Sequence, residues 1–180
     1  MRIALSGSHA VGKTSLLHEL QRRLPGYETI EEPYAELLLT GHEFRDPPSA
    51  DDFVAQLEHS ISRISSDSGT DRIFDRCPAD FLAYLAATNF ETREWISAAH
   101  DALSTIDLIV FVPIEQPDRI SSGISYARQR ARVDALLREM LMDDSYGFGR
   151  PVIEVNGSVE ARTRRSRRPI VQLRSLCGTV

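Results

Sequence analysis

Lysine is almost absent from this chain. Of its 21 basic residues, Lys13 is the only lysine and all the others are arginine. A general bias toward arginine explains the composition, yet a lysine is kept at this one position. Lysine carries a compact ammonium on a flexible stem, whereas arginine carries a planar guanidinium fork, so the two are not interchangeable at a site that needs the ammonium. Lys13 is therefore the first candidate for a working site.

Cysteine and long apolar segments are also scarce. Cys77 and Cys177 lie far apart without metal-ligand spacing, so neither a disulfide framework nor a zinc site is indicated. No apolar run approaches the length that crosses a bilayer, and the first residues lack the apolar core and cleavage site of a secretory signal. We therefore expect a cytoplasmic protein without a membrane partner.

The net charge of −5 disfavours broad nucleic-acid binding, although residues 162–168 form a basic run. In that run we expect Arg164, Arg165, Arg167 and Arg168 to form a solvated surface. A length of 180 residues suits one domain with a sizeable core and is too short for two. We expect a single domain over residues 1–180, for which a protein partner stays open.

Apolar runs of strand length alternate with segments of helical period. This alternation predicts an α/β fold of βαβ units, with a five-stranded parallel sheet and helices on both faces. The predicted strands cover residues 2–6, 27–31, 72–75, 108–112 and 152–155. Predicted helices cover residues 13–24, 79–88, 92–104, 132–141 and 159–176, together with one that is capped near Ser49 or Asp51 and runs through Ile64. We expect Pro169 to interrupt or fray the last helix.

Residues 7–14, GSHAVGKT, match the pattern G-x-x-x-x-G-K-[ST] between a predicted strand and a predicted helix. Its glycines let backbone N–H groups point inward as an anion nest at the start of the helix. The pattern predicts a P-loop NTPase fold that binds ATP, or a close relative, with Mg²⁺. Lys13 would reach the β and γ phosphates, and the Thr14 hydroxyl would join the Mg²⁺ shell. The predicted nucleotide-binding residues of this loop are Gly7, Ser8, His9, Ala10, Val11, Gly12, Lys13, Thr14 and Ser15. A catalytic role for His9 is disfavoured, because the backbone does the binding.

Charged residues follow two further predicted strands, where ligands of open α/β sheets bind. Asp75 ends one strand and is the predicted acid on the Mg²⁺ side, with Arg76 directed at the acceptor. Glu32 follows another strand and is the predicted general base or hydroxyl anchor. Structural alternatives remain open: Asp75 and Arg76 as an ion pair at a strand end, and Glu32 as a cap of the next helix.

These motifs resemble those of known kinases. The segment FDRCPAD at residues 74–80 resembles the Asp-Arg motif of thymidine and deoxynucleoside kinases, and Glu32-Pro33 looks like their Glu-Pro. Together with residues 7–14, the chain is most similar to small AAA-type ATPases related to the ribosylnicotinamide kinase domain of NadR-like proteins. The resemblance implies that Glu32 takes the hydroxyl proton and that Arg76 places the acceptor. An aromatic-rich nucleoside pocket is not evident. The candidates for it are Tyr34, Phe44, Phe53, Phe81 and Tyr84, most of which stand at core-like spacing.

The same resemblance implies an Arg-rich lid at about residues 115–132. Its predicted catalytic arginines are Arg128 and Arg132; a solvated helical turn is the alternative. It also implies that Asn156 and Gly157 contact the adenine, with Arg162 stacked on the base.

Two functions follow. The leading one is an ATP-dependent small-molecule kinase that transfers the γ-phosphoryl, with Mg²⁺, to a hydroxyl of a nucleoside, nucleotide or similar metabolite. The alternative is a regulatory ATP- or GTP-binding module with slow or no hydrolysis. A motor-type ATPase ranks last, since the chain leaves no room for an extra helical domain.

Overall fold

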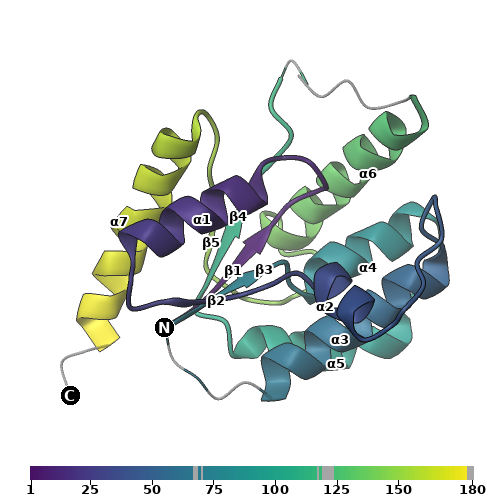
Figure 1. The fold of residues 1–180 in the computed structure, drawn as a ribbon, viewed down its shortest axis with the longest axis horizontal. Helices are drawn as coiled ribbons and strands as arrows, with labels where there is room; N and C mark the ends of the chain where they lie inside the picture. Colours follow the sequence, from purple (N-terminus) through teal and green to yellow (C-terminus); the bar gives the residue numbers. More distant parts are fainter. Residues whose placement is uncertain (67–68, 70, 117, 119–123, 178–180) are drawn as a thin grey trace.

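The computed structural model describes residues 1–66, 69, 71–116, 118 and 124–177. The centre of the fold is a five-stranded parallel sheet with the order β2-β3-β1-β4-β5 (Figure 1). Its strands are β1 (Arg2–Ser6), β2 (Glu28–Ile30), β3 (Arg72–Asp75), β4 (Leu108–Phe111) and β5 (Val152–Glu154). The predicted parallel sheet is confirmed, and β1 and β3 have the predicted bounds.

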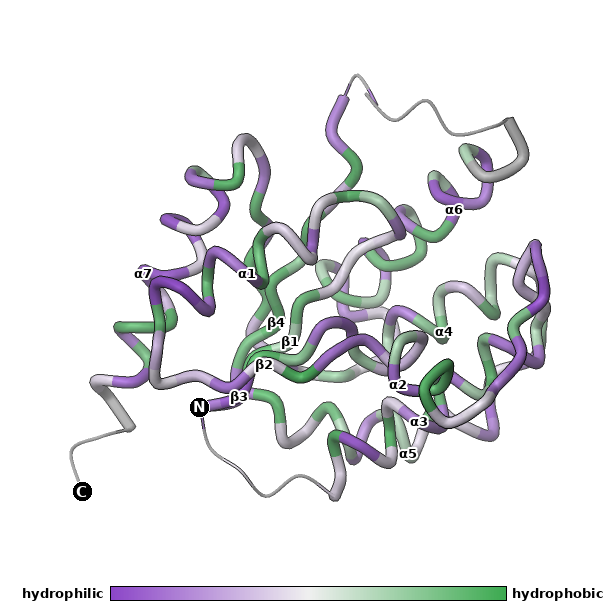
Figure 2. The backbone as a smooth tube through the Cα atoms, viewed as in Figure 1, coloured by the Kyte–Doolittle hydropathy of each residue, from purple (hydrophilic) through white to green (hydrophobic). Residues whose placement is uncertain are grey.

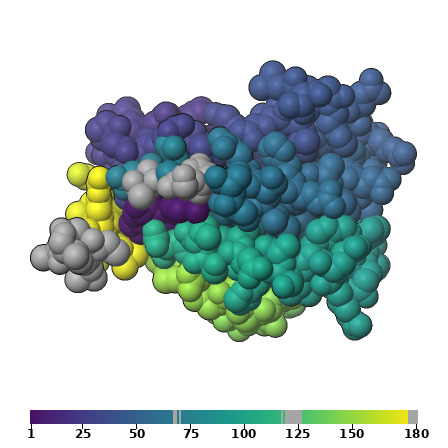
Figure 3. Space-filling view, turned by 90° about the horizontal axis from the view of Figure 1, so that it is seen from below, coloured from purple at the N-terminus to yellow at the C-terminus, as the bar shows by residue number. Residues whose placement is uncertain are grey.

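Helices cover both faces of the sheet. They are α1 (Lys13–Arg23), α2 (Pro33–Leu39), α3 (Ala50–Ser66), α4 (Pro78–Ala87), α5 (Arg93–Ser104), α6 (Ile124–Leu141) and α7 (Val159–Cys177). Helices α1 and α7 pack together on one face, whereas α3, α4, α5 and α6 cover the other, with α2 against α3 (Figure 1). Figure 3 shows α7, in yellow, at one end of the molecule beside the purple N-terminal segment. The arrangement is the predicted three-layer fold.

The alternation of side chains along the strands explains the two cores. Ile3 and Leu5 of β1 pack toward α1 and α7, while Ala4 packs toward the opposite helices. In β4, Val110 and Phe111 likewise belong to opposite cores. Because the sheet is covered on both faces, β4 is hydrophobic along its whole length and β1 is hydrophobic from Ile3 to Leu5, as Figure 2 shows by the green of these strands.

Several boundaries differ from those predicted. Helix α2 was not among the predicted helices, because it has only seven residues and little periodicity to detect. Helix α6 begins at Ile124 rather than Arg132, so most of the described part of the predicted lid is helical. The interruption predicted at Pro169 is wrong: α7 is continuous, because Ser166 and Ile170, both 0% exposed, hold it against the core on either side of the proline.

Candidate active site

The predicted phosphate-binding loop connects β1, the central strand, to α1. Gly7 has a φ of 146°, and a Cβ at this position would lie 2.3 Å from the backbone oxygen of Val112, so no other residue fits there. Gly12 has a φ of 90° and forms the N-cap of α1, which begins at Lys13. The loop thus sits at the carboxyl end of the sheet and at the positive end of a helix, where phosphate is stabilised.

The Lys13 ammonium is folded into its own loop. Its Nζ donates hydrogen bonds to the backbone oxygens of Gly7 and Ser8, both at 2.8 Å, and the residue is only 5% exposed. Burial, followed by the nearby positive charge of Arg76, lowers the pKa of Lys13 to about 7. Phosphate oxygens would restore a strong charge partner to this ammonium.

Asp75 and Thr14 lie together beside the loop. Asp75 ends β3 in register with Leu5 of β1, and its Oδ2 accepts a hydrogen bond of 3.4 Å from the Thr14 hydroxyl. The other carboxylate oxygen, Oδ1, is buried without a hydrogen-bond partner among the described residues, and burial raises the pKa of Asp75. A buried, unsatisfied oxygen beside a hydroxyl fits Mg²⁺, which takes one or two protein ligands and fills its shell with phosphate and water.

Arg76 connects the phosphate loop to Glu32. Its Nε donates to Glu32 Oε2 at 2.9 Å, and its Nη1 donates to the Gly7 backbone oxygen at 3.1 Å. Burial opposes its charge, but Tyr84, Asp80 and Glu32 raise the pKa of Arg76 above its ordinary value. The structure therefore brings together Lys13, Glu32, Asp75 and Arg76, the four predicted catalytic residues outside the lid.

Asp80 holds this arrangement in place and was not predicted as a site residue. It is 0% exposed, and its Oδ1 accepts a hydrogen bond of 2.9 Å from the Gly7 N–H. Its Oδ2 accepts one of 3.0 Å from the Cys77 N–H in a capping box at the start of α4. The spacing of Asp80 three residues after Cys77, with Pro78 at the helix start, was the available sequence signal.

A pocket of about 400 Å³ opens beside Glu32 and Arg76. Its aromatic wall consists of Tyr34, Phe53, Phe81 and Tyr84, and its other lining residues are His9, Glu32, Pro48, Gln56, Arg76 and Gln129. Phe44 does not line the pocket itself but contacts this wall, with its ring centroid 4.3 Å from that of Tyr34. Four of the five candidate aromatic residues therefore line one pocket, which was not evident from the sequence because helices from different parts of the chain bring these rings together. The core-like spacing is also explained, since Phe53, Phe81 and Tyr84 are buried.

His9 faces this pocket from the loop. Its backbone N–H donates to the Tyr84 hydroxyl at 2.8 Å. Burial, then the charge of Arg130, lowers the pKa of His9 to about 4, so its ring is neutral at pH 7. A neutral imidazole adds no positive charge for a phosphate, which agrees with assigning the binding to the loop backbone.

The arginines of α6 divide into buried and exposed residues. Arg130 is 1% exposed, donates through Nε to the His9 backbone oxygen at 3.0 Å, and pairs with Asp118. Arg128 and Arg132, the predicted catalytic pair, are exposed on the same helix. Arg130 lies within the predicted lid but was not among its predicted catalytic arginines; its spacing from the buried Val133 and Leu137 places it on the core-facing stripe. The remainder of the predicted lid, residues 117 and 119–123, lies outside the described residues.

The predicted adenine side also adjoins the loop. Arg162 is 8% exposed; its Nη1 donates to the Val11 backbone oxygen at 2.6 Å, and its Nη2 donates to Glu115 Oε1 at 2.8 Å. Glu115 also accepts a hydrogen bond from the Gly157 N–H, while Asn156 accepts one from Arg165. Glu115, which sequence reasoning missed, thus connects Gly157 to Arg162. Base stacking by Arg162 stays a prediction.

Comparison with known proteins identifies the family. A family profile described as an AAA domain matches residues 2–162. The chain belongs to this AAA domain family. No curated protein matches this chain significantly in sequence. Among the residues that the structure describes, no helix is both long and apolar enough to cross a membrane.

Solved structures show which kinases share the fold of this AAA domain. A deoxyadenosine kinase from M. mycoides aligns with a TM-score of 0.65 at 14% identity, over 96% of this chain and 100% of that chain. The thymidylate kinase from Candida albicans aligns with a TM-score of 0.65 at 16% identity, over 96% and 92%. A NadR protein in complex with NR aligns with a TM-score of 0.66 at 16% identity, covering 95% of this chain and 50% of that protein. The AAA domain therefore has the P-loop fold of nucleoside and nucleotide kinases.

Proposed function

We propose that the protein is an ATP-dependent kinase that transfers the γ-phosphoryl group, with Mg²⁺, to a hydroxyl group of a nucleoside or related riboside. The observation that carries this proposal is the Glu32–Arg76 pair, which stands between the phosphate loop and an aromatic pocket. A carboxylate at the pocket and a cation at the loop are the groups that a transfer to a hydroxyl requires. A nucleotide-binding protein without an acceptor has no need of this arrangement.

Each residue has a distinct role in the proposed reaction. The loop N–H groups and Lys13 bind the triphosphate, and Thr14 and Asp75 would hold Mg²⁺, which would supply positive charge to neutralise the phosphates. Glu32 accepts the proton of the acceptor hydroxyl as the acceptor oxygen bonds to the γ-phosphorus and the bond from that phosphorus to the β–γ bridging oxygen breaks, so that ADP leaves. Its Oε2 already accepts from Arg76, and no described residue donates to Oε1, which leaves that oxygen for the acceptor. Arg76 orients Glu32 and lies close to the loop.

The pocket favours an uncharged acceptor over a nucleotide. A monophosphate brings a charge of roughly −1.5 to −2 at pH 7, which a site must neutralise with free cations. Among the described residues that line the pocket, Arg76 is the one permanent cation, and its Nε and Nη1 are already bonded to Glu32 and Gly7. The aromatic wall instead suits the flat, apolar faces of a base. We therefore favour a nucleoside as acceptor.

The test is ADP release from Mg·ATP in the presence of individual acceptors. The panel contains nucleosides, ribosides including nicotinamide riboside, and nucleoside monophosphates. Stimulation by an uncharged nucleoside or riboside would support the proposal, and stimulation by monophosphates alone would refute the choice of acceptor. ATP binding without stimulation by any acceptor would favour the regulatory nucleotide-binding module instead.

A further inference from the structure

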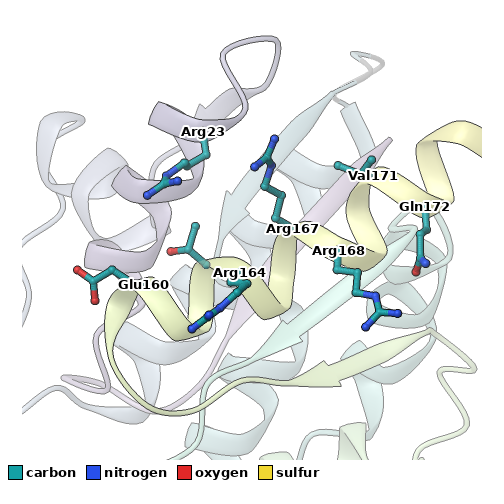
Figure 4. Close-up of a pocket in the computed structure, with 8 residues that line it drawn as sticks. Arg23, Glu160, Arg164, Arg167, Arg168, Val171 and Gln172 are labelled. Atoms are coloured by element: carbon teal, nitrogen blue, oxygen red, sulfur yellow. The ribbon is translucent and has the colours of Figure 1, made fainter.

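A second cavity, of about 670 Å³, lies between the end of α1 and the outer face of α7. Figure 4 shows Arg23 extending from α1, with Arg164, Arg167 and Arg168 along α7. Glu160 stands toward one end of this α1–α7 groove, and Val171 and Gln172 toward the other. None of the residues that line it lines the acceptor pocket or the cavity beside Arg162. The groove is thus separate from the candidate active site.

The arginines of α7 fall into two groups. One group is held by the protein itself: Arg162 contacts Val11 and Glu115, Arg165 pairs with Asn156, and Arg174 pairs with Asp71. The other group consists of Arg164, Arg167 and Arg168, which make no hydrogen bond or ion pair with any residue that the structure describes. Of the arginines of α7, these three are the ones that line the groove.

The lining of the groove selects for an anion. Four arginines and one glutamate line it, in a protein whose net charge is −5. Arg23 donates through Nε to Glu19 at 2.8 Å, so its two terminal nitrogens and the three α7 arginines are the groups left for an anion. Arg164 lies three and four residues before Arg167 and Arg168, a spacing at which like charges repel each other on a helix. An anion between the side chains would remove that repulsion, and guanidinium groups bind phosphate in a bidentate manner.

The size and the ends of the groove indicate a small ligand rather than a polymer. Its volume lies within the range of roughly 300–1,000 Å³ found for small-molecule sites. The three unpaired arginines lie within about one helical turn, roughly 5.4 Å, which is too short a stripe to follow a nucleic-acid backbone. The overall negative charge also repels a long polyanion. Val171, 46% exposed, offers apolar contact to a base, and Gln172 at the same end offers hydrogen bonds to sugar or base, whereas Glu160 stands at the opposite end.

We infer that the α1–α7 groove is a second binding site, which takes a nucleoside di- or triphosphate independently of the phosphate loop. The phosphates lie among Arg23, Arg164 and Arg167, and the base lies toward Val171. The two helices that it bridges also flank the active site, because α1 begins at Lys13 and α7 holds Arg162 against the loop. A ligand there is placed to report on the nucleotide state of the loop.

Isothermal titration calorimetry at constant low salt tests the inference with ATP, ADP and inorganic tripolyphosphate as probes. Wild type is expected to bind two equivalents of ATP, the Lys13→Ala variant one, and the Arg164→Gln/Arg167→Gln variant one. The matched control, Arg63→Gln/Arg93→Gln, removes the same charge from α3 and α5 and should keep two equivalents. Thermal melting of each variant verifies that it is folded.

Tripolyphosphate should bind the groove of the Lys13→Ala variant at least about threefold more weakly than ATP, because it lacks a base. One equivalent on wild type, or two on the Arg164→Gln/Arg167→Gln variant, would overturn the inference. Equal binding of tripolyphosphate and ATP to the groove would overturn its nucleoside part. Tighter binding of a single-stranded oligonucleotide or an acidic peptide than of any nucleotide would assign the groove to a macromolecule and likewise overturn it.

Discussion

The carboxylate of Asp80 accepts a hydrogen bond from the backbone N–H of Gly7 at 2.9 Å, across 73 positions of the sequence. The same side chain caps α4 through the Cys77 N–H. One buried carboxylate therefore fixes the first residue of the phosphate loop relative to the helix that follows Arg76. A single residue thus positions both the phosphate loop and the start of α4.

Replacement of Asp80 by alanine should loosen the loop and destabilise the fold. Two buried N–H groups would lose their acceptor, at about 1–3 kcal/mol for each unsatisfied group. We expect a melting temperature lower by several degrees, at about 2–4 °C per kcal/mol, and ATP affinity reduced about tenfold. Calorimetry and thermal melting measure both effects, with the exposed Asp101→Ala as control. Unchanged ATP affinity in the Asp80→Ala variant would contradict this role.

Replacement of Lys13 by methionine should stabilise the nucleotide-free protein while abolishing ATP binding. Below about pH 7 the ammonium is charged in both the folded and the unfolded chain, so its burial cost is fully present. Between about pH 7 and its ordinary pKa of 10.5, the folded chain releases a proton that the unfolded chain keeps, and wild type gains stability. The advantage of the Lys13→Met variant should therefore shrink as pH rises from 7 to 9.5. If the melting temperatures of the two proteins stay equally far apart at every pH, the lowered pKa of Lys13 is contradicted.

Removal of the Tyr84 hydroxyl should weaken catalysis, while the aromatic ring still lines the pocket. The Tyr84→Phe variant keeps the ring but removes the acceptor for the His9 N–H. Loss of one neutral hydrogen bond, at about 0.5–1.5 kcal/mol, predicts a decrease in kcat/KM for ATP of about 2–10-fold, with the acceptor KM nearly unchanged. Tyr146→Phe, in a tyrosine outside the pocket, is the control. A larger change in the KM for the acceptor than in kcat/KM for ATP would show that the hydroxyl binds the acceptor instead.

The arginines of α6 should differ in what they contribute. Arg130→Gln removes the buried contact to the His9 oxygen and should weaken ATP binding about tenfold, as for a hydrogen bond from a charged group. Arg128→Gln and Arg132→Gln should leave ATP binding intact and lower kcat if these exposed arginines reach the transferred phosphoryl group. Steady-state kinetics with separate binding measurements distinguishes these effects. Unchanged kcat in both exposed-residue variants would favour the solvated helical turn.

Local patterns predicted much of the fold and part of the site. The loop from Gly7 to Thr14 was predicted because glycine, lysine and hydroxyl positions are fixed by backbone geometry and phosphate chemistry. Asp75 was predicted because charged residues at the carboxyl ends of parallel strands converge. These features depend on neighbours in sequence, so a single sequence is enough to indicate them.

The remaining features depend on contacts between distant segments. Phe53, Phe81 and Tyr84 stand at helical spacing that also fits a core, and only the packing of α3 against α4 turns them toward one pocket. Glu115 lies in a segment without periodicity, and its bond to Arg162 spans 47 positions. Pro169 was expected to interrupt or fray α7, but the packing of the buried face of this helix outweighs the low helix propensity of proline.

Direct detection of the phosphorylated acceptor tests the central claim most directly. Wild type and the Glu32→Gln variant are incubated with Mg·ATP and the stimulating nucleoside, and the products are identified by mass spectrometry and phosphorus NMR. The account predicts a nucleoside monophosphate from wild type, and at least about 100-fold less from Glu32→Gln, in line with the contribution of a general base, with ATP affinity unchanged. Equal product from both proteins would contradict the role of Glu32, and phosphate release to water alone would contradict the kinase.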